Sequence, residues 1–179
     1  MVQAGLHSTN NVIKIGEVDL NQLRNDIQDI PKQRQYPLQG TSKEDFDSSL
    51  SNDINLRDNE TDYVYRLYDN LDYTYSLIEQ YKLYRARYMF LPSITCYGYH
   101  KDNTPRIHIP IETNENCFFV LDDKVVRLPA DGSVYWVDTR LSHTFVNSNT
   151  HKSDFVRSHL VANTMLNESE IHSLADRLL

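Results

Sequence analysis

The sequence predicts a mainly β protein, an antiparallel sandwich or barrel with helices on its flanks. After residue 84, short runs rich in β-branched and aromatic residues follow one another without an intervening helical pattern. Tyr, which suits strands, occurs 12 times in the 179 residues, whereas Gly occurs only 5 times. Apolar residues at helical spacing occur only before and after this region.

Two helices are expected in the first 83 residues. One should run from Leu20 to Ile30, where apolar residues recur at helical spacing, with Asp19 as its cap and Pro31 ending it. A second is expected over Tyr63 to Tyr81 because apolar residues again mark one face. The polar, acidic segment from Thr41 to Asp62 is either a solvated surface loop or a flap over a site.

Seven strand-like runs form the predicted core. They are Tyr84–Tyr99, Arg106–Thr113, Cys117–Leu121, Lys124–Leu128, Ser133–Val137, His143–Asn147 and Phe155–Ala162. Asp122-Asp123 predicts a tight hairpin, and residues 129–132 predict a turn. A last helix is expected from Glu168 to Leu178, with Asn167 and Glu170 as a capping box. We therefore expect a single domain over residues 1–179, with a helical part (1–83), a β core (84–162) and a C-terminal helix (163–179).

Composition limits the classes of partner and the location. With 18 Lys and Arg against 25 Asp and Glu, the net charge of −7 disfavours a nucleic-acid partner. No apolar stretch is long enough to span a membrane, and the first residues lack the apolar segment of a signal peptide, so a cytoplasmic protein is expected. Cys96 and Cys117 are too few for a disulfide framework or a four-cysteine zinc site, and both are expected to be buried, reduced thiols.

One histidine carries a possible metal-binding pattern. Of the seven histidines, only His100 has an acid two residues later, in His100-Lys101-Asp102. On an extended chain the side chains of i and i+2 share a face, so both should point the same way where a strand-like run ends. His143 is the best candidate for a third ligand because it opens another run, and two or three hairpins fit into the 41 residues between it and Asp102. Such a set leaves positions open on an octahedral metal and is typical of non-haem Fe(II) sites. For any single histidine, the alternative is a surface or hydrogen-bonded core residue.

Three further polar residues lie on strand-like runs. Arg157 is expected to be buried, and a buried guanidinium needs an anionic partner, either an Asp or Glu side chain or the carboxylate of a ligand. Arg106 and His108 share one face of a run whose other face carries isoleucines. That polar face lines a cavity or is solvated.

The stretch from Arg87 to Ala162 resembles the Fe(II)/2-oxoglutarate-dependent oxygenases. Within them it is most similar to the aspartyl/asparaginyl β-hydroxylase-like group, which also holds bacterial free-proline hydroxylases. The matching pieces are HKD at 100–102, RIHIPIETN at 106–114, GSVYW at 132–136, the run from His143 to Asn147, and RSHLV at 157–161.

The resemblance implies a double-stranded β-helix (jelly-roll, cupin-like) core with flanking helices. It implies that His100, Asp102 and His143 are the iron ligands and that Arg157 binds the C5 carboxylate of 2-oxoglutarate. Arg106 and His108 correspond to residues that help hold the cosubstrate in aspartyl β-hydroxylases. The best-known pattern of those enzymes lacks the acidic ligand, so Asp102 places this chain nearer the members with a complete triad.

The expected function is therefore hydroxylation by an Fe(II)- and 2-oxoglutarate-dependent dioxygenase that uses O2. The substrate would be a free amino acid or an Asp, Asn or Pro side chain of a peptide or protein, with no nucleic-acid or membrane partner. The alternatives are a non-catalytic cupin-like module that binds a metal or ligand, and a zinc or manganese cupin enzyme with the same ligands but no cosubstrate. An arginine placed to hold a dicarboxylate distinguishes the oxygenase hypothesis from that of a non-catalytic module, which has no need of one.

Overall fold

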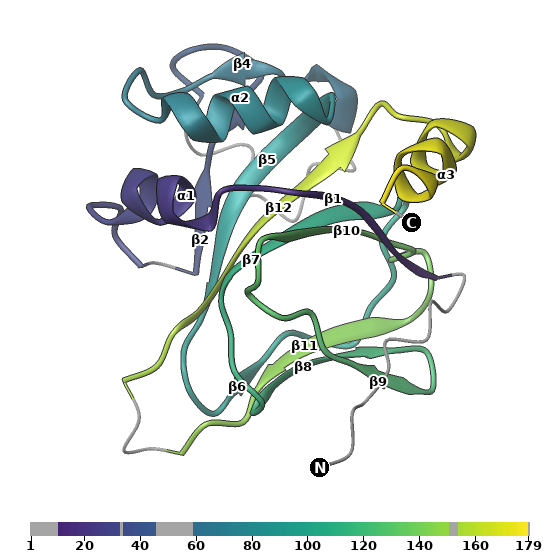
Figure 1. Cartoon of the computed structure of the whole chain (residues 1–179). Coiled ribbons are helices and arrows are strands. Elements are labelled where there is room, and N and C mark those ends of the chain that lie inside the picture. Colours follow the sequence, from purple (N-terminus) through teal and green to yellow (C-terminus); the bar gives the residue numbers. More distant parts are fainter. Residues whose placement is uncertain (1–10, 33, 46–58, 151–153, 179) are drawn as a thin grey trace.

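Two antiparallel sheets face each other in the computed structural model, which describes residues 11–32, 34–45, 59–150 and 154–178 (Figure 1). Within these residues the larger sheet has the order β1 (Val12–Glu17), β10 (Ser133–Val137), β7 (Arg106–Glu112), β12 (Arg157–Thr164), β5 (Leu83–Leu91) and β2 (Gln35–Pro37). The smaller sheet has the order β6 (Thr95–Cys96), β11 (His143–Asn147), β8 (Cys117–Leu121) and β9 (Lys124–Val126).

The strand order is that of a jelly roll. From β5 to β12 the chain moves between the two sheets and contributes β10-β7-β12-β5 to one and β6-β11-β8-β9 to the other. Every neighbouring pair is antiparallel. The expected fold class, a mainly β protein with a jelly-roll core and flanking helices, is therefore confirmed.

Two hydrophobic cores lie on the two faces of the larger sheet. Helices α1 (Leu20–Ile27), α2 (Asp72–Gln80) and α3 (Glu168–Asp176) cover its outer face, where the isoleucines of β7 are fully buried (Figure 1). The second core lies between the sheets and includes Leu91, Phe119 and Phe145. Because neighbouring side chains of a strand point to opposite faces, Arg106 and His108 of β7 face inward between the sheets.

The predicted helix over Tyr63 to Tyr81 is wrong in its first half. Helix α2 begins only at Asp72, and of the apolar face expected before it Val64 is 44% exposed, whereas Leu67 and Leu71 are buried without being helical. Here the backbone forms the short strand β4 (Tyr65–Arg66), which pairs with β3 (Gln39–Gly40). Pairing with distant strands therefore overrides the local periodicity, as tertiary contacts commonly do.

The N-terminal part contains strands that the sequence pattern did not predict. Strand β1 pairs with β10, and β2 pairs with β5, so both extend the larger sheet beyond the jelly roll. The first helix is confirmed but ends at Ile27, three residues earlier than expected, and the Asp19 side chain accepts hydrogen bonds from the first-turn amides. The C-terminal helix has the predicted capping box of Asn167 and Glu170.

The strand predictions in the core are mostly accurate. The β8, β10 and β11 boundaries agree with the expected runs, whereas the run from Tyr84 to Tyr99 divides into β5 and β6. The β8–β9 hairpin turns at Asp122, whose φ is 56°, and Gly132 has a φ of 91° in the turn before β10. Gly132 is suited to this turn because glycine adopts positive φ without steric cost.

Two expectations about individual side chains have different outcomes. Cys117 is buried as predicted, but Cys96 is exposed on β6, a two-residue strand at the edge of the smaller sheet. Both cysteines are free thiols. In the parts of the chain that the structure describes, each helix is too short or too polar to cross a bilayer.

Replacing Leu160 by Ala should lower the free energy of unfolding by about 2–5 kcal/mol, because Leu160 is fully buried on the central strand β12 and truncation leaves a cavity. Urea denaturation measures the change. Val125→Ala on β9 is the matched control, since Val125 is 60% exposed and should change the same quantity by less than about 0.5 kcal/mol. Equal losses in both variants would contradict the assigned core.

Candidate metal centre and its cavity

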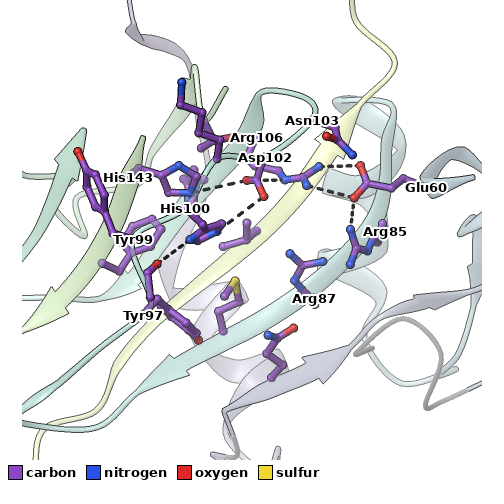
Figure 2. Close-up of a pocket in the computed structure, with 18 of the residues that line it drawn as sticks. Glu60, Arg85, Arg87, Tyr97, Tyr99, His100, Asp102, Asn103, Arg106 and His143 are labelled. Atoms are coloured by element: carbon purple, nitrogen blue, oxygen red, sulfur yellow. Dashed lines mark hydrogen bonds and ion pairs between the residues drawn. The ribbon is translucent and has the colours of Figure 1, made fainter. Parts of the chain in front are cut away.

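A cavity of about 750 Å³ opens between the two sheets, at the end where the loop after β6 meets the start of β11 (Figure 2). This volume suits a small-molecule ligand. His100, Asp102 and His143 line it, and one ligand atom from each lies within 4.8 Å of the others. Among the described residues this is the cluster of His, Cys, Asp and Glu side chains that could hold a metal ion.

Backbone pairing brings the three residues together. Beyond the β6–β11 pair, His100 and His143 form a further antiparallel bridge in which each amide donates to the other carbonyl, at 3.1 and 2.8 Å. The amide of Asp102 then donates to the carbonyl of Thr139 at 2.9 Å. The predicted convergence of His100, Asp102 and His143 is therefore present, but β6 ends at Cys96, so His100 and Asp102 lie in the loop after it and not at a strand end.

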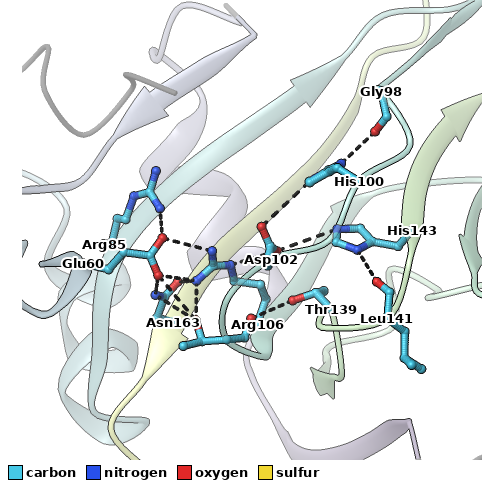
Figure 3. Close-up of polar contacts among 11 residues, drawn as sticks. Glu60, Arg85, Gly98, His100, Asp102, Arg106, Thr139, Leu141, His143 and Asn163 are labelled. Carbon is cyan, nitrogen blue, oxygen red and sulfur yellow. Dashed lines mark hydrogen bonds and ion pairs between the residues drawn. The ribbon is translucent and has the colours of Figure 1, made fainter. Parts of the chain in front are cut away.

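Both imidazole rings are oriented by backbone carbonyls (Figure 3). His100 Nδ1 lies 2.7 Å from the carbonyl oxygen of Gly98, and His143 Nδ1 lies 3.0 Å from that of Leu141. Nδ1 is the donor in each contact, because a carbonyl only accepts, so Nε2 of the neutral ring keeps its lone pair. The Nε2 atoms lie 3.8 and 3.7 Å from the Asp102 carboxylate oxygens. Carbonyl contacts of this kind are the usual support of metal-binding histidines.

The ionisation states of Asp102 and His143 suit a metal ion. Burial alone would raise the pKa of Asp102, but the charge and hydrogen bond of Arg106 hold it below the ordinary value. Burial lowers the pKa of His143, which favours its neutral form. A cation needs an ionised carboxylate and an unprotonated imidazole nitrogen, and both groups therefore offer the form that binds.

A network of charged side chains, centred on the buried Arg106, holds the Asp102 carboxylate in place. Arg106 is 3% exposed and donates to the Asp102 carboxylate at 3.1 Å and to both oxygens of Glu60, at 3.1 and 3.2 Å. Glu60 also pairs with Arg85 and accepts a hydrogen bond from Asn163. Arg106 further donates to Thr104 and Asn163. Its donors are therefore used within the protein (Figure 3).

Deeper between the sheets lie polar atoms that have no partner among the described residues. His108 and His159 are both only 1% exposed. Within the described residues, both ring nitrogens of His108 and the Nε2 atom of His159 lack a hydrogen-bond partner. Burial lowers the pKa of both far enough to keep them neutral at physiological pH. Unsatisfied buried nitrogens cost free energy, so they point to a ligand or water that completes them.

Arg157 is buried in the same region but does not line the cavity. Its guanidinium lies 4.1 Å from the ring centre of Phe145, which does line the cavity, and Nη2 lies 3.0 Å from His159 Nδ1. Burial lowers the pKa of Arg157 to about 9, so it stays charged at neutral pH. Within the described residues it forms no ion pair with an Asp or Glu, and Phe145 lies between its guanidinium and the cavity.

The structure gathers five of the six predicted site residues around one cavity: His100, Asp102, His143, Arg106 and His108. The two β7 residues are buried against the cavity, so the alternative of a solvated face is wrong. Sequence analysis missed Glu60, Arg85 and Arg87. The last two alternate on β5 with Met89, and that period of two was the signal that could have placed them on the cavity face.

The predicted flap or surface loop from Thr41 to Asp62 lies mostly outside the described residues. Its described end includes the short 3-10 helix η3 (Glu60–Asp62), which brings Glu60 to the cavity.

Comparisons with known proteins find structural likeness alone. No family model matches the chain, and no curated protein matches it. Solved structures that match include a cupin 2 conserved barrel domain protein from Salinispora arenicola CNS-205, with 16% identity, a TM-score of 0.35 and coverage of 51% of this chain and 70% of that one. Another is a cupin 2 domain-containing protein from Halorhodospira halophila, with 10% identity, a TM-score of 0.36 and coverage of 51% and 63%. The jelly-roll assignment rests on the strand order itself.

Replacing Glu60 by Gln should lower the free energy of unfolding at pH 7 by about 2 kcal/mol, after allowance for solvent screening. Burial raises the pKa of Glu60, but Arg106, Arg85 and Asn163 together lower it from its ordinary value of 4.5 to about 2. Because the folded-state pKa is depressed, this stabilisation is complete above about pH 4.5 and is lost as the pH falls through about 2.

Denaturation of both proteins between pH 7 and pH 2 tests this, and the difference between them should shrink as the pH falls. Glu168→Gln is the control, because Glu168 is 72% exposed in a long surface ion pair and should have little effect. A difference between wild type and Glu60→Gln that stays constant with pH would contradict the assignment.

Proposed function

We propose that the chain is an Fe(II)- and 2-oxoglutarate-dependent dioxygenase that hydroxylates an amino acid or an amino-acid side chain. The observation that carries the proposal is the convergence of His100, Asp102 and His143 at the mouth of a jelly-roll cavity. Two imidazoles and one carboxylate leave coordination positions for a cosubstrate and O2, as in non-haem Fe(II) oxygenases. The sequence resemblance supports the same ligand set.

The chemistry of the donor atoms fits an iron site. Each histidine has its Nδ1 held by a backbone carbonyl, so its Nε2 is available, and Arg106 keeps Asp102 ionised. Fe(II) would be held by these three side chains and would supply O2 activation, with 2-oxoglutarate and O2 consumed and succinate and CO2 released as the substrate is hydroxylated.

His108 in the cavity wall and Arg157 behind that wall also support an anionic cosubstrate. Both ring nitrogens of His108 lack a partner among the described residues. Arg157 lies behind the ring of Phe145 and has no acidic partner in the described chain. A carboxylate held by Arg157 would replace the missing counter-charge of that buried guanidinium. In the proposed reaction the protein would bind and orient the two substrates and keep water from the buried part of the site.

A non-catalytic cupin-like module is the alternative, and one observation favours it. Phe145 separates Arg157 from the cavity, so in this structure the guanidinium is not open to a ligand. Iron-dependent conversion of 2-oxoglutarate to succinate without a substrate decides between the two functions. Wild-type protein with Fe(II) and ascorbate should release succinate above the metal-free background. A metal-loaded protein without such release would favour the module or a cupin enzyme that needs no cosubstrate.

His100→Ala and His143→Ala should each abolish tight Fe(II) binding, because the candidate site has only three protein ligands. Anaerobic equilibrium dialysis, followed by metal analysis, measures the iron bound per chain. His172→Ala is the matched control, since His172 is exposed on α3 and should retain wild-type binding. Retention of full metal affinity in either ligand variant would show that the triad is assigned wrongly.

Binding of 2-oxoglutarate should depend on Arg157 more than on Arg106. Truncating one partner of a buried charge-assisted pair costs about 2–5 kcal/mol, and Lys cannot reproduce the two-pronged contact of Arg. Arg106 already donates to Asp102, Glu60, Thr104 and Asn163. Anaerobic titration of the Fe(II) protein with 2-oxoglutarate tests Arg157→Lys beside Arg106→Lys. Wild-type affinity in the first variant and loss in the second would move the anchor to Arg106.

A further inference from the structure

Arg87 is a cation in the wall of the cavity for which the described chain provides no partner. It lies on β5 between Arg85 and Met89, and all three side chains line the cavity. Its Nε is buried without a hydrogen-bond partner, and no ion pair joins Arg87 to an acid within the described residues. Figure 2 shows the side chain beside Arg85, without a contact to any residue drawn.

The neighbouring arginines, unlike Arg87, form ion pairs with acidic side chains. Arg85 pairs with Glu60, and Arg106 pairs with Glu60 and Asp102, so the two acids that line the cavity are already engaged. Burial, together with the charges of Arg85 and Arg106, lowers the pKa of Arg87 to about 9, so it remains charged at neutral pH. A partly buried charge without a partner is costly, and proteins tolerate one mainly where a ligand completes it.

We propose that Arg87 binds the α-carboxylate of the substrate, and that the substrate is therefore a small carboxylic acid, such as a free amino acid. The inference rests on the proposed function, because it places the acid in the same cavity as the triad. It separates two substrate classes that the sequence leaves open, since a residue within a peptide chain has no free α-carboxylate.

Charge and size favour a small carboxylate over other anions. One unpaired guanidinium matches a single negative charge and the two oxygens of a carboxylate, whereas a phosphate dianion normally requires more donors. The remaining lining cations, Arg34 and Lys101, are exposed, and the guanidinium of Arg34 lies 4.7 Å from the ring centre of Tyr97. The cavity of about 750 Å³ can hold a cosubstrate and a small acid together.

Calorimetric titrations of the full chain, loaded with Mn(II) as a redox-stable substitute for iron and with 2-oxoglutarate, test the inference. The probes are L-proline, L-aspartate and L-asparagine, each beside its α-carboxamide. At least one acid should bind at least tenfold more tightly than its amide. Arg87→Met should remove that preference, whereas Arg140→Met, at an exposed arginine paired with Asp138 outside the cavity, should keep it.

A stability measurement separates a binding role from a structural one. Arg87→Met removes an unpaired, partly buried charge, so its Tm should be no lower than that of wild type. Arg85→Met should lower the Tm because it removes a counter-charge from Glu60. A fall in Tm for Arg87→Met as large as that for Arg85→Met would overturn the proposal and make Arg87 a structural residue.

The outcomes also separate this inference from the proposed function. Acid binding that depends on Arg87, in a protein that releases no succinate from 2-oxoglutarate, would keep the carboxylate site and remove the oxygenase. Succinate release with acids and amides bound equally, or with Arg87→Met unchanged, would overturn the carboxylate site alone. Loss of 2-oxoglutarate affinity in Arg87→Met, with unchanged affinity in Arg157→Met, would also overturn it, because Arg87 would then be the cosubstrate anchor. Tighter binding of inorganic phosphate than of any of the three acids would likewise overturn the carboxylate site.

Discussion

The buried guanidinium of Arg106 is the interaction on which the site depends. It lies on β7 in the jelly roll and joins two carboxylates from separate parts of the chain, Asp102 in the loop after β6 and Glu60 in η3. Burying either carboxylate without a counter-charge would cost free energy, and so would burying the arginine without an acidic partner. The same contact therefore keeps a candidate metal ligand ionised and fastens the segment around η3 to the jelly roll.

The period-two alternation of strands determines what surrounds this contact. On β7 the isoleucines pack against the helices, while Arg106 and His108 turn inward. On β5 the same rule turns Arg85 and Arg87 inward. Since β5, β12 and β7 are adjacent in the larger sheet, their inward faces form one continuous wall. A strand shifted by one residue would place these charges in the hydrophobic core beneath the helices.

How much of this could be predicted depends on whether a feature is local. The β8, β10 and β11 strands lie between turn signals and were predicted at their exact bounds, and the capped helix α3 was close. Strands β2, β3 and β4 are short and form only because distant strands offer them partners, so no local pattern predicted them and Tyr63–Tyr81 was interpreted as one helix. Leu67 and Leu71 are buried as the apolar spacing predicts but lie outside any helix, so the spacing indicated burial and not the backbone conformation.

The same distinction holds for the site. His100 and Asp102 are two residues apart directly after a strand-like run of the sequence, and His143 opens a strand, so the triad could be inferred from the sequence together with the resemblance. Glu60 could not, because it lies 46 residues before Arg106 and nothing local relates the two. Arg87 was visible as part of an alternating run, but its lack of a partner is a property of the assembled cavity and required the structure.

The charges of the cavity run against those of the chain as a whole. The protein has a net charge of −7, yet the cavity is lined by the five cations Arg34, Arg85, Arg87, Lys101 and Arg106 and by the two acids Glu60 and Asp102. A divalent ion at the triad would meet one ionised ligand and a surplus of positive charge, which opposes its binding. An anion bound in the same cavity reduces that repulsion, and the ion in turn attracts the anion, because such coupling is reciprocal. The surplus of arginines therefore favours joint occupation of the cavity by a metal ion and carboxylates over occupation by the metal ion alone.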